Sequence, residues 1–222
     1  SWWTMQIKVT YFDIEAVAEK LRLALCMTNT PFEDERVTFP DWQKMKPTVK
    51  YNQLPVLEVD GEKMYQSSAQ LRFLGKLGDG SLYPQDPKMA YKVDMMMGLC
   101  DDLNRAFTPA LYLGMRHTNF GYPEEWPEKA ATVQAVREKF VKELLPTHMQ
   151  HLSEAIKENG GKFACGDTLT IADLQWYPQL RYFTKGVADH VPSDCLNAYP
   201  EVLAYMERVL AVPQIKEWYS KH

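Results

Sequence analysis

The fold is decided by residues 53–67, QLPVLEVDGEKMYQS. Two strand-like runs, 55–59 and 62–65, flank the pair Asp60-Gly61. An Asp-Gly pair between two such runs is a strong signal for a two-residue β-hairpin turn, because both residues tolerate the positive φ that the turn requires. The residues that follow, 67–77, place apolar side chains at helical spacing. The stretch therefore predicts an antiparallel hairpin that leads directly into a helix.

The residues before the hairpin predict a strand, a helix and a second strand. Residues 6–12 alternate apolar and polar side chains, which is typical of a strand. Residues 16–27 have helical spacing, and residues 33–39 form another short strand-like run. Together with the hairpin and its helix, the order is strand, helix, strand, loop, strand, strand, helix. This order predicts a small α/β domain over residues 1–84.

Beyond a linker rich in glycine and proline, the chain is predicted to be all helical over residues 85–222. The predicted helices cover residues 88–105, 128–158 (bent at Pro146), 169–185, 201–210 and 214–220. No strand pattern interrupts them. An α/β domain followed by an all-α domain restricts the fold to a small number of architectures.

The composition excludes several classes of function. The 222 residues carry a formal net charge of -4 and no Lys/Arg cluster, so nucleic acid is not an expected partner. No run of about 20 apolar residues predicts a membrane segment, and residues 1–4 do not have the pattern of a secretory signal. The four cysteines are far apart and form no Cys-x-x-Cys pair. We therefore expect a cytoplasmic chain with free thiols.

Three positions are candidates for chemistry, and each has a purely structural alternative. Tyr11 ends the first strand, where α/β proteins bind ligands, but its position alone favours a buried strand tyrosine with a satisfied hydroxyl. Pro55 is either a rigid turn or a cis proline that exposes the backbone of Leu54. Ser67 with Gln70 has the spacing of a capping box, yet a hydroxyl at a helix N-terminus also suits a carboxylate ligand.

Taken together, a series of short motifs resembles the cytosolic glutathione transferases. The motifs are Tyr11-Phe12, Asp41-Trp42, Lys46, Gln53-Leu54-Pro55, Gln66-Ser67, Asp101-Asp102 and the stretch 166–173. Each motif is weak by itself, whereas their order and spacing over most of the chain are specific. The resemblance is closest to the sigma class, which includes glutathione-dependent prostaglandin D synthases. It implies a thioredoxin-like first domain, an all-α second domain and a homodimer.

The resemblance also implies a role for individual residues. Tyr11 would donate a hydrogen bond to the sulfur of glutathione, the co-substrate. The remaining contacts would be Trp42, Lys46 and Gln53 at the glycine end, the Leu54 backbone beside cis Pro55 at the cysteinyl unit, and Gln66, Ser67 and the partner subunit's Asp102 at the γ-glutamyl end. Small hydrophobic electrophiles would bind in a pocket formed by Phe12, Ile14, Val17, Phe107 and Tyr112. For Phe107 and Tyr112, a place in the core of the helical domain is the open alternative.

The mechanism follows from thiol chemistry. A free thiol has a pKa of about 8.5, so only a few per cent of it is the nucleophilic thiolate at neutral pH. A hydrogen bond to a charged acceptor is worth about 1.5–3 kcal/mol, which lowers the thiol pKa by about one to two units. Tyr11 is expected to act as this donor and not as a base, because a phenol keeps its proton near neutral pH.

Two positions depart from the family pattern. Members of this type often carry an Arg six residues after the tyrosine, where this chain has Val17, and no neighbouring cation in the sequence replaces it. The prostaglandin synthases carry a third Asp one turn before the Asp pair, associated with a divalent metal, where this chain has Gly98. We therefore expect no metal site. His148 and His151 lie three residues apart without an evident third ligand, which favours surface histidines.

Three functions remain open on the sequence alone. The first is conjugation of glutathione to hydrophobic electrophiles, as in detoxification. The second is a glutathione-dependent isomerase of the prostaglandin D synthase type. The third is a non-catalytic carrier or crystallin-like protein on the same fold, to which Val17 gives some weight. The retained tyrosine and glutathione motifs favour an enzyme, and conjugation is the leading prediction.

Overall fold

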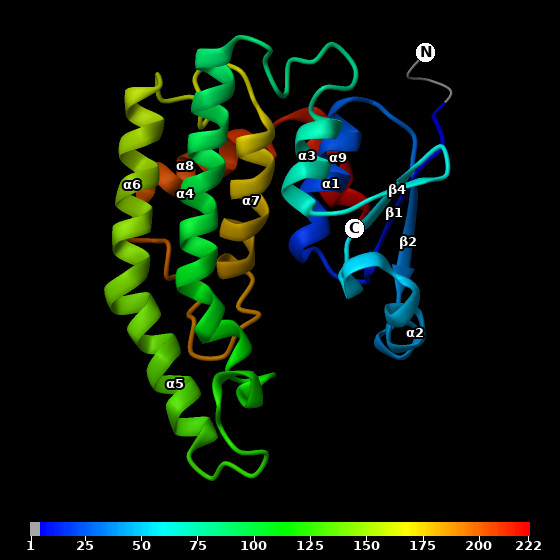
Figure 1. Ribbon diagram of the computed structural model, residues 1–222. Helices are drawn as coiled ribbons and strands as arrows, with labels where there is room; N and C mark the ends of the chain where they lie inside the picture. Colours follow the sequence, from blue (N-terminus) through cyan, green and yellow to red (C-terminus); the bar gives the residue numbers. More distant parts are fainter. Residues whose placement is uncertain (1–4) are drawn as a thin grey trace.

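The computed structural model describes residues 5–222 (Figure 1). Residues 1–4 lie outside the described residues, so the structure does not test the prediction that they form no secretory signal. Figure 1 shows a small sheet on one side of the molecule and a bundle of long helices on the other. The helices α1 (Ala16–Met27), α3 (Ser67–Leu74) and α9 (Pro213–Lys221) lie between these two parts.

The sheet has four strands in the order β2-β1-β3-β4. Their bounds are Ile7–Phe12 for β1, Glu33–Val37 for β2, Val56–Val59 for β3 and Glu62–Met64 for β4. β1 is parallel to β2 and antiparallel to β3, and β3 and β4 form the predicted hairpin. Asp60 and Gly61 both have positive φ, at 50° and 85°. The thioredoxin-like prediction for the N-terminal domain is therefore confirmed.

The segment between β2 and β3 is more ordered than predicted. The strand ends at Val37, not at residue 39, and α2 (Phe39–Met45) follows where a loop was predicted. Thr38 caps this helix, because its hydroxyl accepts the backbone N–H of Asp41 at 3.3 Å. Two short 3-10 turns then lead the chain into β3. A helix of seven residues is too short for hydrophobic periodicity to reveal it.

The predicted capping box at the start of α3 is wrong. The helix begins at Ser67, so the residue before it is Gln66, which has a φ of 71° and makes no side-chain cap. The side chain of Gln70 turns instead toward the hairpin and donates to the carbonyls of Pro55 at 3.1 Å and Met64 at 2.8 Å. Gln70 therefore joins the helix to the hairpin and leaves the hydroxyl of Ser67 available to a ligand.

The second part of the chain is all helical in the described residues, as predicted. Its helices are α4 (Pro87–Tyr112), α5 (Lys129–Lys139), α6 (Leu145–Glu158), α7 (Ile171–Thr184), α8 (Pro200–Leu210) and α9. Where a bend at Pro146 was predicted, the structure has a π-helical turn over Phe140–Leu144. Pro146 has no N–H to donate to the turn before it, which disturbs the regular α-helical hydrogen bonds there. A capping box at Thr170 and Asp173 opens α7. No helix of residues 5–222 is long and apolar enough to cross a membrane.

The two parts share one continuous core. Helix α1 packs against α3, α7 and α9, and α7 packs in turn against α4. Fully buried leucines of α1, together with Trp176 of α7 and Trp218 of α9, fill the space between the sheet and the bundle. The predicted boundary between residues 84 and 85 falls in the linker between Leu74 and Pro87, and its position stays a prediction.

Candidate active site

A small cavity of about 110 Å³ opens where the hairpin meets α3. It is lined by Tyr51, Gln53, Leu54, Pro55, Tyr65, Gln66 and Ser67. Five of these seven residues are ones that the sequence motifs singled out as the glutathione site. The Leu54-Pro55 peptide bond is cis, and the amide of Gln66 donates to the amide oxygen of Gln53 at 3.4 Å.

The local backbone explains why polar groups converge here. The positive φ of Gln66 turns the chain sharply out of β4, so that Ser67 becomes the first residue of α3. The first N–H groups of a helix have no partner within the helix and attract negative charge. A carboxylate that enters the cavity would therefore meet both these N–H groups and the Ser67 hydroxyl.

Two aromatic side chains that line this cavity, Tyr51 and Tyr65, were not predicted from the sequence. The rings of Tyr51 and Tyr65 meet edge to face at 5.5 Å, one before the hairpin and one after it. Tyr51 has a φ of 64°, so the chain turns there in a conformation that non-glycine residues adopt rarely. Their positions at the two ends of the hairpin could have indicated that they line the site. Neither residue, however, belongs to one of the motifs that the sequence analysis used.

Tyr11 lies at the end of the central strand and is 7% exposed. Burial raises the pKa of its hydroxyl, while the backbone N–H of Val17 and the charges of Arg22 and Arg116 lower it. The net direction is upward, so the phenol keeps its proton at neutral pH. The group is therefore a hydrogen-bond donor and not a base, in keeping with the sequence analysis.

Two cations, Arg22 and Arg116, act on the Tyr11 hydroxyl and were not predicted from the sequence. Arg22 is fully buried and donates to the carboxylates of Asp34 at 2.9 Å and Glu19 at 3.1 Å. Arg116 is exposed and forms no ion pair among residues 5–222. Arg22 lies on the buried face of α1, and Arg116 lies in the segment that follows α4. Neither residue is near Tyr11 in the sequence, so the sequence did not reveal them.

An exposed apolar patch adjoins Tyr11. Ile14 and Val17 are 53% and 44% exposed in the loop that follows β1 and at the start of α1. The ring of Phe12 stacks on Phe39 at 6.4 Å and meets the buried Trp42 edge on at the same distance. Phe39 is 61% exposed and was not predicted, because it was assigned to the end of a strand.

Phe107 and Tyr112, which were expected in the electrophile pocket, lie on α4 beyond the predicted end of that helix and have different environments. Phe107 is 3% exposed and packs against Phe140 at 4.9 Å and Phe183 at 5.1 Å, which is the core alternative left open by the sequence. Tyr112 is half-buried, and its phenol is one of the groups that raise the pKa of Tyr11. The guanidinium of Arg116 lies 5.2 Å from the centre of the Tyr112 ring.

Lys46 and Asp102 do not line the cavity. Lys46 is exposed just after α2 and forms no ion pair within the described part of the chain. Asp102 is exposed on α4 and pairs with Arg105 one turn along the helix. A side chain added at Gly98 would meet no atom within 4 Å, and the described residues contain no group of three metal ligands.

The cysteines of the chain are poor nucleophiles. All four are free. Burial raises the pKa of Cys100 and Cys165 to about 12 and that of Cys26 and Cys195 to about 11. These thiols stay protonated at neutral pH, so none of them is activated as a thiolate.

Comparisons with known proteins agree with this geometry. A family model described as glutathione S-transferase, N-terminal domain, matches residues 7–76, and the corresponding C-terminal domain model matches residues 118–222. Glutathione S-transferase S1 of Drosophila melanogaster is 31% identical over 217 residues, which cover 95% of this chain and 76% of that protein.

Solved structures extend the similarity to three dimensions. The prostaglandin synthase D of Nilaparvata lugens superposes with a TM-score of 0.82 at 28% identity, over 98% of both chains. The monomeric glutathione S-transferase Na-GST-3 of Necator americanus has a TM-score of 0.75 at 28% identity, over 98% of this chain and 97% of that one. The chain therefore belongs to the glutathione S-transferase family and is a glutathione-dependent transferase.

Proposed function

We propose that Tyr11 activates the sulfur of glutathione for attack on a small hydrophobic electrophile. The observation that carries this proposal is the buried phenol at the end of β1, whose raised pKa keeps it a donor. A donor aimed at the sulfur stabilises the thiolate more than the thiol, because the charged form accepts the stronger bond. The thiolate then attacks the electrophile at high effective concentration.

The glutathione tripeptide is proposed to lie along the cavity at the hairpin. Ser67, Gln66 and the N-terminus of α3 would receive the γ-glutamyl carboxylate, and the Leu54 backbone would pair with the cysteinyl unit. Gln53, Trp42 and Lys46 would hold the glycine end, where the charge of the exposed Lys46 favours a carboxylate.

The electrophile is proposed to bind on the apolar patch beside Tyr11. Phe12, Ile14 and Val17 contribute this surface, with Phe39 next to Phe12. Tyr112 would close the pocket from the helical domain, and Phe107 would support it from the core. Conjugation of such compounds is a detoxification chemistry, and we propose that the chain is of the sigma class on the motifs given above.

A prostaglandin-type isomerase is the second candidate. The similarity to the Nilaparvata lugens prostaglandin synthase D favours it. Gly98 argues against the metal-dependent form, since only the two carboxylates of Asp101 and Asp102 remain on this helix. No metal is therefore part of the proposal.

We further propose a cytoplasmic homodimer in which Asp102 completes the glutathione site of the partner subunit. Four free thiols suit a reducing compartment. The exposure of Asp102 on α4 leaves it available to a second subunit, although the similar Na-GST-3 is described as monomeric. The domains would divide at residues 1–84 and 85–222.

Product analysis tests the main proposal. The protein is incubated with glutathione and an aryl halide, and separately with an endoperoxide, and the products are identified by mass. A glutathione adduct of the aryl halide supports conjugation. Isomerised endoperoxide without any adduct supports the second candidate, and glutathione binding without turnover of either compound supports a carrier.

A further inference from the structure

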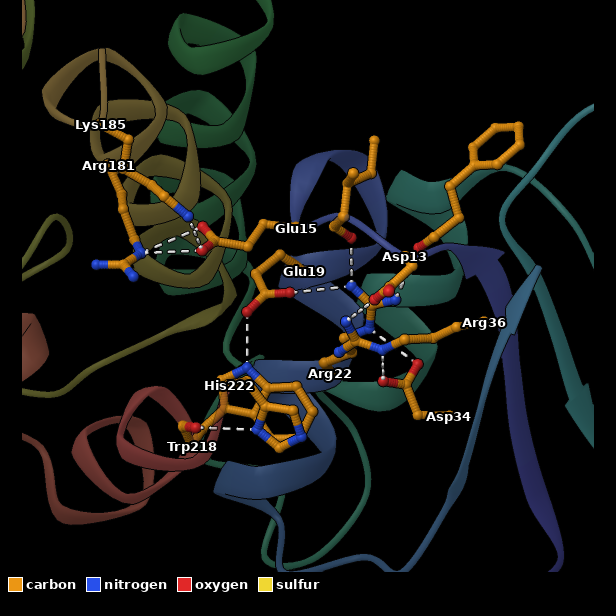
Figure 2. A network of polar contacts seen from close by, with 12 residues as sticks. Asp13, Glu15, Glu19, Arg22, Asp34, Arg36, Arg181, Lys185, Trp218 and His222 are labelled. Atoms are coloured by element: carbon orange, nitrogen blue, oxygen red, sulfur yellow. Dashed lines mark hydrogen bonds and ion pairs between the residues drawn. The ribbon is translucent and has the colours of Figure 1, made fainter. Parts of the chain in front are cut away.

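The loop that follows Tyr11 is fixed on three sides by charged side chains (Figure 2). Arg36 of β2 donates to Asp13 at 2.6 Å. Arg22 of α1 donates to the carbonyl of Ile14 at 2.7 Å, within a buried network that includes Glu19 and Asp34. Two of these three attachments therefore come from the N-terminal domain itself.

The third attachment comes from the helical domain. Glu15 accepts Lys185 at 2.6 Å on one oxygen, and the Arg181 Nε lies 3.2 Å and 3.3 Å from its two oxygens. Figure 2 shows both basic side chains extending from α7 to the same carboxylate. The guanidinium of Arg181 also lies 4.2 Å from the centre of the Tyr219 ring on α9. The Glu15 carboxylate thus joins the loop after the tyrosine to the C-terminal end of α7 and, through Arg181, to α9.

The position of Glu15 in the chain makes this attachment relevant to catalysis. Glu15 is four residues from Tyr11 and two from Val17, whose backbone N–H faces the Tyr11 hydroxyl. Ala16, between them, has a φ of 40°, which is unusual for a residue with a side chain. The loop therefore adopts a conformation that its own residues do not favour, and contacts from outside must hold it.

We propose that Glu15 is a positioning residue: its pairing with Arg181 and Lys185 holds the β1–α1 loop against the helical domain and so keeps the Val17 N–H and the Tyr11 hydroxyl in the arrangement that activates glutathione. This inference rests on the proposed role of Tyr11. It assigns to α7, which lines no part of the cavity at the hairpin, an influence on sulfur activation.

The test is Glu15→Gln, which keeps the shape of the side chain and removes its charge. The thiolate absorbance of the glutathione complex is titrated against pH. The bound thiol pKa should rise by about half a unit to one unit, which means about three- to tenfold less thiolate below that pKa. The KM for glutathione should change less than twofold, because the tripeptide is held elsewhere. Lys185→Gln is a second variant that removes half of the pairing and should give a smaller shift in the same direction.

A matched control separates positioning from stability. Asp94→Asn breaks an ion pair of similar exposure, which Arg72 makes at 2.9 Å between α3 and α4. Both this variant and Glu15→Gln should lower the melting temperature slightly, but only the latter should shift the thiol titration. An unshifted titration in both Glu15→Gln and Lys185→Gln, or an equal shift in Asp94→Asn, would overturn the inference. A wild-type complex with an ordinary thiol pKa would instead overturn the proposed role of Tyr11, and the inference with it.

Discussion

The side chain of Gln70 donates a hydrogen bond to the carbonyl of Pro55 at 3.1 Å, which joins the second turn of α3 to the start of the hairpin. The same amide donates to Met64 at the other end of the hairpin. Gln70 is 1% exposed, so these bonds are shielded from water. The bridge fixes the position of α3 relative to the cis proline, and with it the two sides of the proposed glutathione cavity.

Gln70 is engaged in this bridge and does not form a capping box with Ser67, whose hydroxyl has no hydrogen-bond partner within residues 5–222 and can accept a ligand. Ser67→Ala should weaken glutathione binding by about 1.5–3 kcal/mol, the value of a hydrogen bond to a carboxylate. The melting temperature without ligand should stay almost unchanged. Titration calorimetry and a thermal melt separate the two effects, with Ser68→Ala as the neighbouring control. Lower stability with unchanged affinity would restore the capping interpretation.

This part of the molecule also shows what the sequence could and could not predict. The Asp60-Gly61 turn and the helix α1 depend on local signals, and both were predicted closely. The capping box at Ser67 failed because Gln70 finds better partners across the hairpin, which is a tertiary contact. Arg116 and Phe39 were missed for a related reason: folding brings the charge of Arg116 to act on Tyr11 and the ring of Phe39 onto Phe12, and no local pattern marks either residue.

Asp173 should be essential to the stability of the helical domain. It is fully buried, and its carboxylate accepts the backbone N–H of Ala164, the backbone N–H of Thr170 and the hydroxyl of Tyr205, each at 2.8 Å. Asp173→Ala would leave these donors unpaired and should cost about 3 kcal/mol or more. Tyr205→Phe removes only one donor and should cost about 1–2 kcal/mol. Urea denaturation measures both, and equal costs would show that the carboxylate is not the centre of the network.

The positive charge of Arg116 should stabilise the thiolate of bound glutathione. It would take over the role of the arginine that family members often carry at the position of Val17. Arg116→Gln should raise the pKa of the bound thiol by about half a unit, the size expected for a charge acting across a partly hydrated site. Arg116→Lys retains the charge and should recover most of the effect, whereas Arg208→Gln on α8 is a control outside the site. If the lysine and glutamine variants behave alike, charge is not what Arg116 contributes.

Asp102 should connect oligomerisation to glutathione binding. In a homodimer, Asp102→Ala would remove an acidic partner for the γ-glutamyl amine and should weaken binding by about 1.5–3 kcal/mol. Light scattering gives the mass in solution, and calorimetry gives the affinity. The exposed pair of Glu217 with Lys221 on α9 provides a control, Glu217→Gln, that removes a carboxylate elsewhere on the surface. A monomer with wild-type affinity in the Asp102 variant would exclude a shared site.

Tyr11→Phe tests the central step, because it removes one hydroxyl and keeps the buried ring. The bound thiol should titrate about one to two units higher, equivalent to a lost charge-assisted hydrogen bond. Turnover at pH 7 should fall accordingly and recover as the pH rises, since the thiolate then forms without help. In the wild type the active form of Tyr11 is the protonated one and burial raises its pKa, so activity should not decline through ionisation of Tyr11 below about pH 10. Thiolate absorbance against pH decides the matter, with the exposed Tyr91→Phe as control; identical curves for wild type and Tyr11→Phe would assign the activation to another donor.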